Sequence, residues 1–158
     1  MGHQHYHLDA LEALKRQPRA CLSEQARAAN RAVTRFYARY LKDCDIGIAQ
    51  LALLVRLYYV REAGMGQLAS DLELDRTTLA RTVQTLVNSG HLSVSAGQDR
   101  RSRLVRLTDK GFESLRQAVP RWQQAQAELR GLIGDSGWAT AWQSMRLLVD
   151  TLGLPEED

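Results

Sequence analysis

Cysteine, proline and aromatic residues are scarce in this chain of 158 residues, and their scarcity narrows the class of protein. Two cysteines, Cys21 and Cys44, are too few for a disulfide framework, and their spacing matches no zinc motif. No apolar run approaches the roughly 20 residues that a membrane-spanning helix needs, and the first residues lack the apolar block of a signal peptide. We therefore expect a mainly helical protein in the cytoplasm, without membrane contact.

A recognisable catalytic arrangement is missing as well. No serine–histidine–aspartate order, phosphate-binding loop, metal-ligand cluster or paired carboxylates occur in a plausible context. His91 stands at the start of an expected strand and lacks an evident partner. The alternating His3, His5 and His7 could hold a metal, but a flexible tail is favoured because no further ligand types are nearby. We expect no enzyme activity, no cofactor and no metal site.

The charge that is present is unevenly placed. The formal net charge is +3. Residues 75–110 contain seven basic and three acidic side chains, whereas the rest of the chain contains 14 basic and 15 acidic ones. A local basic patch favours a polyanionic partner more than an evenly spread excess does. A solvated arginine cluster is the alternative interpretation of the same patch.

Apolar spacing predicts helices over most of the chain. The apolar residues of segment 22–41 recur at threes and fours, which predicts a long helix, and segment 48–60 is apolar enough for a buried one. A short helix should follow and stop near Glu73. Asp75 is a suitable N-cap for the next helix, and Gly90 stands where that helix should end. Two helices joined by so short a turn predict a helix-turn-helix.

The helix after Asp75 has one apolar face and one unusual polar face. Leu79, Val83 and Leu86 fall on the apolar face, which we expect to belong to the core. A helix built for solubility usually carries Glu and Lys, which form helices better than Thr does. The polar face instead carries arginines, short hydroxyls and an amide, namely Arg76, Thr77, Arg81, Thr82, Thr85 and Asn88.

Alternating residues predict a β-hairpin directly after this helix. Segments 91–96 and 103–107 read as strands on either side of a charged turn, so the hairpin is interpreted as a two-stranded wing. Thr108 should then cap a helix that Pro120 bends or splits. Gly131 and Gly134 should end that helix, and a last one should begin at Asp135.

The fold class predicted from these elements is mainly α. It is a winged helix-turn-helix domain with N- and C-terminal helices that form a dimerisation module, because those helices cannot bury their apolar faces on so small a core. The expected organisation is a flexible segment at 1–20 and a single domain at 21–158. Within that domain the winged helix-turn-helix spans about 46–110, and the dimerisation helices span about 21–44 and 111–153.

The order of these parts resembles the MarR family of transcription regulators, named after multiple antibiotic resistance. The matching stretches are NRAVTRFY at 30–37, GQLASDLELDRTTLARTVQTLVNSGHL at 66–92 and DRRSRLVRLTDKG at 99–111. The wing motif, Asp-x-Arg followed by a strand and Leu-Thr-x-x-Gly, is the most specific of them. The resemblance runs from about residue 21 to 152. It implies a homodimer that binds pseudo-palindromic double-stranded DNA, usually as a repressor, and that is released by a small molecule or by cysteine oxidation.

The resemblance also implies which residues contact DNA. A helix with short side chains fits the major groove, and an arginine at a hairpin tip can enter a narrow minor groove. The recognition-helix positions are Arg76, Thr77, Thr78, Arg81 and Thr82. On the wing, Arg101 would be the minor-groove arginine, Asp99 would pair with an arginine such as Arg81, and Arg100 and Arg103 would contact phosphates. For Arg106 we favour simple surface solubilisation.

The resemblance extends to a branch of the family that senses organic hydroperoxides through a cysteine near the start of the first helix. Cys21 lies at such a helix start beside Arg19, and both a helix N-terminus and a cation favour the thiolate. Tyr37 stands where that branch has a tyrosine. Cys21 falls about two positions early, however, and Arg27 replaces another tyrosine. A buried, inert Cys21 and an incidental Cys44 are the alternatives.

A ligand-responsive mechanism is the other possibility for release. Many members of the family bind phenolic or other small anions between the dimer module and the winged domain. Arg56, Tyr58, Tyr59 and Trp122 could line such a cleft here, although aromatic residues at helical spacing are more often core. A winged helix used only for protein contacts is the alternative from another class. The basic, threonine-rich face argues against it.

Overall fold

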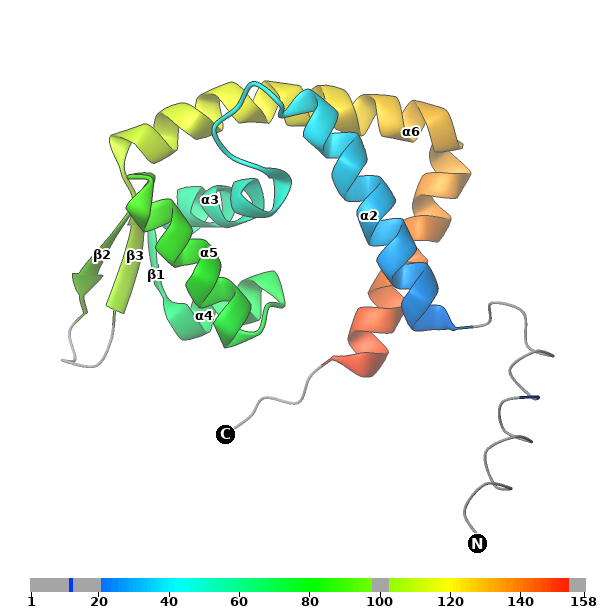
Figure 1. Ribbon diagram of the computed structural model, residues 1–158, viewed down its shortest axis with the longest axis horizontal. Coiled ribbons are helices and arrows are strands. Elements are labelled where there is room, and N and C mark those ends of the chain that lie inside the picture. The colour runs from blue at the N-terminus through cyan, green and yellow to red at the C-terminus, as the bar shows by residue number, and fades with distance from the viewer. Residues whose placement is uncertain (1–11, 13–20, 98–102, 154–158) are drawn as a thin grey trace, which may run out of the picture. The chain divides into compact units, whose positions relative to one another are not determined.

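The computed structural model describes residues 12, 21–97 and 103–153 of the chain (Figure 1). By their internal contacts the residues divide into two compact units, 1–35 and 36–158. The boundary falls inside helix α2 (Leu22–Tyr40), which spans the long N-terminal helix expected from the sequence. No helix in the described ranges is both long and apolar enough to cross a lipid bilayer.

The core of the second unit is built from three helices and a small sheet. The helices are α3 (Ile48–Val60), α4 (Met65–Leu72) and α5 (Arg76–Asn88), and their bounds follow the predicted segments closely. Leu53, Leu54 and Leu57 of α3 are fully buried, in keeping with the nearly continuous apolar sequence of that helix. They pack in one cluster with Leu68 of α4 and with Leu79 of α5.

The turn between α4 and α5 forms as the sequence predicts. Glu73 adopts a left-handed conformation with φ of 53° and ends α4. Asp75 then caps α5, since its Oδ1 accepts a hydrogen bond of 2.8 Å from the backbone N–H of Thr78. At the other end, Gly90 has φ of 78°, a conformation that glycine adopts without strain. These two ends fix the length of the candidate recognition helix.

The sheet has one strand more than the sequence predicted. Strands β2 (Leu92–Ala96) and β3 (Arg103–Leu107) form the expected hairpin, with Val94 opposite Val105. A third strand, β1 (Glu62–Gly64), pairs antiparallel with β3 on its other side, which gives the order β1-β3-β2. The prediction of a wing without this strand was incomplete, because a segment of three residues is too short to show an alternating pattern.

Helix α6 (Asp109–Leu152) runs to the end of the described chain and bends once. Thr108 caps it as predicted, its Oγ1 accepting a hydrogen bond of 3.1 Å from the Gly111 N–H. Of the two outcomes predicted for Pro120, a split does not occur, because the backbone stays helical there. Pro120 is exposed, so water can bond the carbonyl that loses its helical partner. The helix departs from helical geometry at Gly134, with φ of 71° and ψ of 167°, a region open almost only to glycine.

Candidate nucleic-acid interface

Helix α5 presents the face that the sequence singled out. Leu79, Val83 and Leu86 are buried, so the helix is fixed by its apolar side. On the opposite side Arg76, Thr77, Thr78 and Arg81 are exposed, and Thr82 is half-buried. The structure therefore keeps the five predicted recognition residues together on the first two turns of one helix. Thr85 and Asn88 are exposed further along it.

The threonine hydroxyls on this face are oriented by the helix backbone. Thr82 Oγ1 donates a hydrogen bond of 3.0 Å to the carbonyl oxygen of Thr78, and Thr85 Oγ1 donates one of 2.9 Å to that of Arg81. The hydroxyl hydrogens are thus engaged within the helix. What these threonines offer outward is an acceptor oxygen and a methyl group, which suits a base-edge donor or a thymine methyl.

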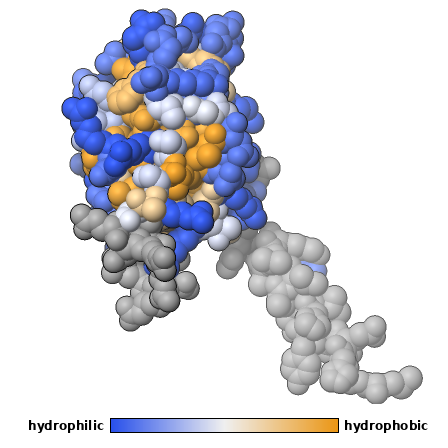
Figure 2. Space-filling view, turned by 90° about the vertical axis from the view of Figure 1, so that its left-hand side faces the viewer, coloured by the Kyte–Doolittle hydropathy of each residue, from blue (hydrophilic) through white to orange (hydrophobic). Residues whose placement is uncertain are grey.

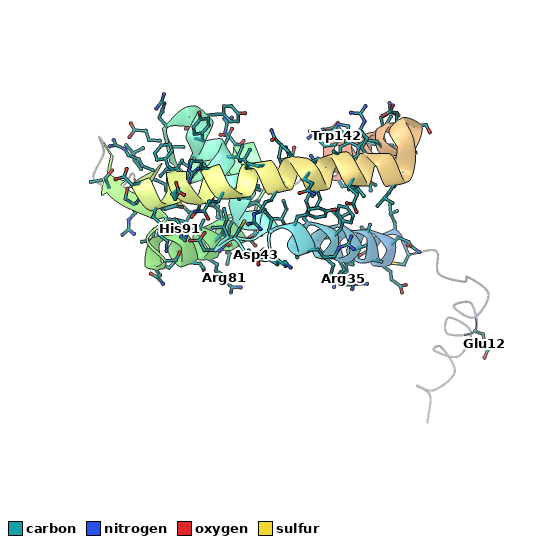
Figure 3. The ribbon with its side chains drawn as sticks, turned by 90° about the horizontal axis from the view of Figure 1, so that it is seen from above. Glu12, Arg35, Asp43, Arg81, His91 and Trp142 are labelled. Carbon is teal, nitrogen blue, oxygen red and sulfur yellow. The ribbon has the colours of Figure 1, made fainter. Side chains whose placement is uncertain are left out.

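The two arginines of this face have no acidic partner among the described residues. Arg81 points away from the body of its unit (Figure 3). No carboxylate in the described part of the chain takes up their donors or cancels their charge, which leaves both for a ligand. Arg76 and Arg81 are therefore suited to phosphate oxygens or to the O6 and N7 acceptors of guanine.

Strand β3 carries two exposed arginines that differ in their surroundings. Arg106 forms an ion pair and hydrogen bond with Glu62 of β1. Arg103 lies at the beginning of the strand and has no ion-pair partner within the described ranges. The remaining predicted wing residues, Asp99, Arg100 and Arg101, lie outside the described residues. Of the two arginines on β3, Arg103 is the one whose charge no described carboxylate compensates.

The wing end of the unit also exposes apolar atoms. Figure 2 shows an apolar area on this face, surrounded by hydrophilic side chains. On the elements at this end, Val94 of β2 and Phe112 of α6 are exposed. Tyr58 packs edge-on against Phe112, with ring centroids 6.3 Å apart.

The four predicted ligand-cleft residues have different surroundings. Arg56 is paired with Asp71, with Nε and Nη2 each 2.7 Å from Oδ2, so its charge is already compensated. Tyr58 and Tyr59 are exposed and contact each other edge to face. Trp122 is half-buried against the core cluster. A cleft built from these four residues stays a prediction.

The two cysteines are both free thiols. Cys21 is exposed, so the alternative of a small buried side chain was wrong. Cys44 is half-buried, lies in the turn after α2 and packs against the core cluster. Tyr37, which the resemblance put near a sensing cysteine, is buried and donates a hydrogen bond to Gln126 Oε1. Burial raises the pKa of the Tyr37 hydroxyl.

A polar cluster that the sequence did not reveal lies at the C-terminal end of α5. His91 is only 1% exposed, and its Nε2 is 2.8 Å from Asp45 Oδ2. Ser114 Oγ donates to the other Asp45 oxygen at 2.9 Å, and Ser89 Oγ lies 2.7 Å from His91 Nδ1. The expectation that His91 lacks a partner was therefore wrong. Asp45 is 46 positions away in the sequence, and only a polar residue inside an apolar stretch could have signalled the contact.

Comparisons with known proteins agree with this architecture. No protein-family profile and no curated protein matches the sequence. Among solved structures, the Mycobacterium tuberculosis transcriptional regulator MosR in complex with DNA is 31% identical, with a TM-score of 0.71 over 84% of this chain and 93% of that one. An Escherichia coli MarR mutant with operator DNA is 24% identical, with a TM-score of 0.72 over 81% of this chain and 93% of that one. The PcaV regulator of Streptomyces coelicolor with its natural ligand is 22% identical, with a TM-score of 0.74 over 83% and 93%.

The fold, the exposed polar face of α5 and the similar solved structures together define a winged helix-turn-helix protein. The protein is a DNA-binding transcriptional regulator. Its identity to MosR over nearly the whole of both chains narrows the class further. The chain belongs to the MarR family of transcription regulators. This confirms the resemblance drawn from the sequence and the implied role of DNA-binding transcription regulator, in preference to a winged helix used for protein contacts alone.

Proposed function

We propose that the protein is a homodimeric repressor that binds pseudo-palindromic operator DNA through the start of α5 and through the wing. The observation that carries this proposal is the polar face of α5, where two exposed arginines have no acidic partner in the described part of the chain. Short threonines between them allow the helix to approach base edges closely. Arg76, Thr77, Thr78, Arg81 and Thr82 are the proposed reading residues.

The wing would add a contact in the neighbouring minor groove. Arg101 is the proposed groove residue, from its place in the Asp-x-Arg motif and from the affinity of narrow minor grooves for arginine. Arg100 and Arg103 would bind phosphates, and Asp99 would hold the turn. The charge of Arg103, which no acidic side chain in the described ranges compensates, supports this part of the proposal.

A second copy of the chain is the proposed partner of the C-terminal helix. Beyond the bend at Gly134, α6 exposes large apolar side chains that no described residue covers, namely Trp142, Met145, Leu147, Val149 and Leu152. Exposed apolar surface of this extent is typical of an interface. Because two-fold symmetry would place two α5 helices on one duplex, a dimer accounts for the pseudo-palindromic operator as well.

Two mechanisms of release from DNA are proposed, and they depend on different residues. An oxidant could act on Cys21, whose thiol is exposed at the start of α2. A small phenolic effector could instead bind a cleft near Tyr58, Tyr59 and Trp122, with Arg56 available only if it leaves Asp71. Operator binding titrated with hydroperoxide, in wild type and in Cys21→Ser, separates them. Equal release of both proteins would exclude Cys21 as the sensor.

The DNA contact itself is tested on an operator found in the promoter region beside the coding gene. Arg81→Ala should weaken specific binding by about 1–3 kcal/mol, because it removes a charged donor from the groove. Thr85→Ala, one turn further along the same exposed face, is the matched control and should bind nearly as wild type does. Fluorescence anisotropy at two salt concentrations measures both. Unchanged affinity and salt slope for Arg81→Ala would contradict the proposed orientation of α5.

A further inference from the structure

The His91 cluster, formed by Asp45, Ser89, His91 and Ser114, joins four separate segments of the winged-helix unit by hydrogen bonds. Ser89 is the C-cap of α5, and His91 immediately precedes β2. Asp45 comes from the turn between α2 and α3, and Ser114 is on α6. His91 lies between α6 and the helices beneath it (Figure 3). His91 thus joins α5 and the start of β2 to Asp45, and Asp45 joins them to Ser114 of α6.

The backbone around His91 is fixed just as closely. The His91 carbonyl accepts a hydrogen bond of 3.0 Å from the Thr108 N–H, and its N–H donates one of 2.8 Å to the Leu86 carbonyl. Gly111 packs so closely that a Cβ there would lie 2.3 Å from the His91 carbonyl oxygen. The backbone of His91 is therefore held on both sides, and its imidazole is buried.

The hydrogen bonds allow two protonation states with the same heavy-atom positions. In the neutral state Nε2–H donates to Asp45, and the Ser89 hydroxyl donates to Nδ1. When Nδ1 takes a proton from solvent, Nδ1–H donates to Ser89 Oγ. The Ser89 hydroxyl then turns to the Thr85 carbonyl at 3.0 Å or to the Leu86 carbonyl at 3.2 Å. No polar group of the cluster is left without a partner in either state.

Two charged side chains, Asp45 and Lys110, face the cluster. Asp45 faces Nε2 from the turn before α3, and the Lys110 ammonium of α6 lies 3.8 Å from the same carboxylate and donates to the Ser89 carbonyl. Burial opposes ionisation of Asp45 and is the largest single influence on its pKa, but the hydrogen bonds from His91 and Ser114 outweigh it and hold that pKa below its usual value. Asp45 therefore remains an anion where histidine ordinarily titrates.

We propose that His91 is a proton-responsive positioning residue for operator binding. Protonation turns the contact of His91 with Asp45 into an ion pair, and Nδ1–H then donates a hydrogen bond to Ser89, the C-cap of α5. The recognition helix and the wing are therefore held more firmly on α6. A duplex also favours any added positive charge on the protein. Both effects make affinity rise as pH falls through the titration of His91. The inference rests on the proposed use of α5 to bind DNA.

The titration of His91 can be followed without other histidines, because the chain has only four and the other three can be replaced. Replacing His3, His5 and His7 by Gln leaves His91 as the sole imidazole, and none of the three belongs to the proposed interface. Operator affinity is measured by anisotropy at constant ionic strength from about pH 5.5 to 8. In parallel, NMR follows the His91 ring protons in the free and the DNA-bound protein, which separates His91 from the terminal amine.

We expect the affinity to rise by up to about tenfold per pH unit for each proton taken up. By reciprocity the His91 titration must then move to higher pH in the DNA complex. His91→Phe should abolish the pH dependence, and a loss of stability alone would leave the pH dependence in place. Identical NMR titrations with and without DNA would overturn the inference even if His91→Phe fails to fold.

Arg81→Ala in the same background distinguishes this inference from the proposed function. If Arg81→Ala binds the operator as tightly as the parent, the orientation of α5 on DNA is wrong. If Arg81→Ala weakens binding while the His91 titration is unaffected by DNA, α5 reads the operator and only the role of His91 fails.

Discussion

At the scale of single residues, pairing decides which basic side chains are available to DNA. Arg76, Arg81 and Arg103 have no acidic neighbour among the described residues, whereas Arg56 and Arg106 are paired with Asp71 and Glu62. All carry the same charge, so composition cannot separate them. Exposed ion pairs contribute little to stability, but they cancel a charge that would otherwise attract a polyanion.

Two arginines of β3 test this distinction. Arg103→Ala should weaken operator binding and lower the salt slope by about one for each phosphate that the variant no longer neutralises. Arg106→Ala, further along the same strand, should change the slope much less because Glu62 already compensates Arg106. Binding isotherms at several salt concentrations measure both slopes. Equal effects of the two substitutions would show that the ion pair does not matter.

The cap of α5 gives a pH-dependent prediction. Hydrogen bonds from the Thr78 side chain and then from its backbone N–H hold the pKa of Asp75 below its usual value. A lowered pKa contributes stability that is present above the unfolded value of about 4 and is lost as pH falls through the folded value. Asp75→Asn keeps a capping oxygen without the charge. In urea unfolding the advantage of the wild type should shrink from about pH 6 to about pH 3. A constant difference would contradict the prediction.

At the scale of elements, the contact between β2 and α6 is decided by a missing side chain. Gly111 lies in the first turn of α6, where the helix passes directly over the His91 carbonyl. The backbone of Gly111 is helical, which any residue can adopt. Glycine is needed there because a side chain would meet the His91 carbonyl. The Leu-Thr-x-x-Gly part of the wing motif thus has a packing reason in this chain.

Substituting two glycines of the same helix tests that reason. Gly111→Ala should destabilise the protein by about 1–3 kcal/mol, because the new Cβ would meet the His91 carbonyl. Gly131→Ala has nothing within 4 Å of its new Cβ and should stabilise the protein by up to about 1 kcal/mol. Urea unfolding followed by circular dichroism gives both values. A neutral Gly111→Ala would mean that the strand and the helix can separate at no cost.

At the scale of the whole molecule, the apolar surface of α6 beyond Gly134 supports the proposed dimer. Trp142 is 65% exposed, and four other large apolar residues of the same segment are exposed with it. Tyr59, on α3, is 73% exposed but belongs to the winged-helix part. Exposure alone does not tell which of these residues belong to the proposed dimer interface. Their position in α6 or in α3 does.

The proposed dimer therefore predicts different outcomes for two similarly exposed aromatics. Trp142→Glu should convert the dimer to monomer in sedimentation velocity and lower operator affinity, because a charge would be buried at the interface. Tyr59→Glu should leave the sedimentation coefficient unchanged. A dimer that survives Trp142→Glu would remove this surface from the interface.

By itself, the sequence determined the helices of the winged-helix part and the hairpin, since hydrophobic period and cap residues such as Asp75 and Thr108 act within a few positions. It also marked the polar face of α5, because that pattern is local. Only the tertiary structure decided which charges are free and which are paired. It added β1 beside β3, joined Arg106 to Glu62 and buried His91 against Asp45. These contacts join residues forty or more positions apart, and they arise from packing that no local pattern records.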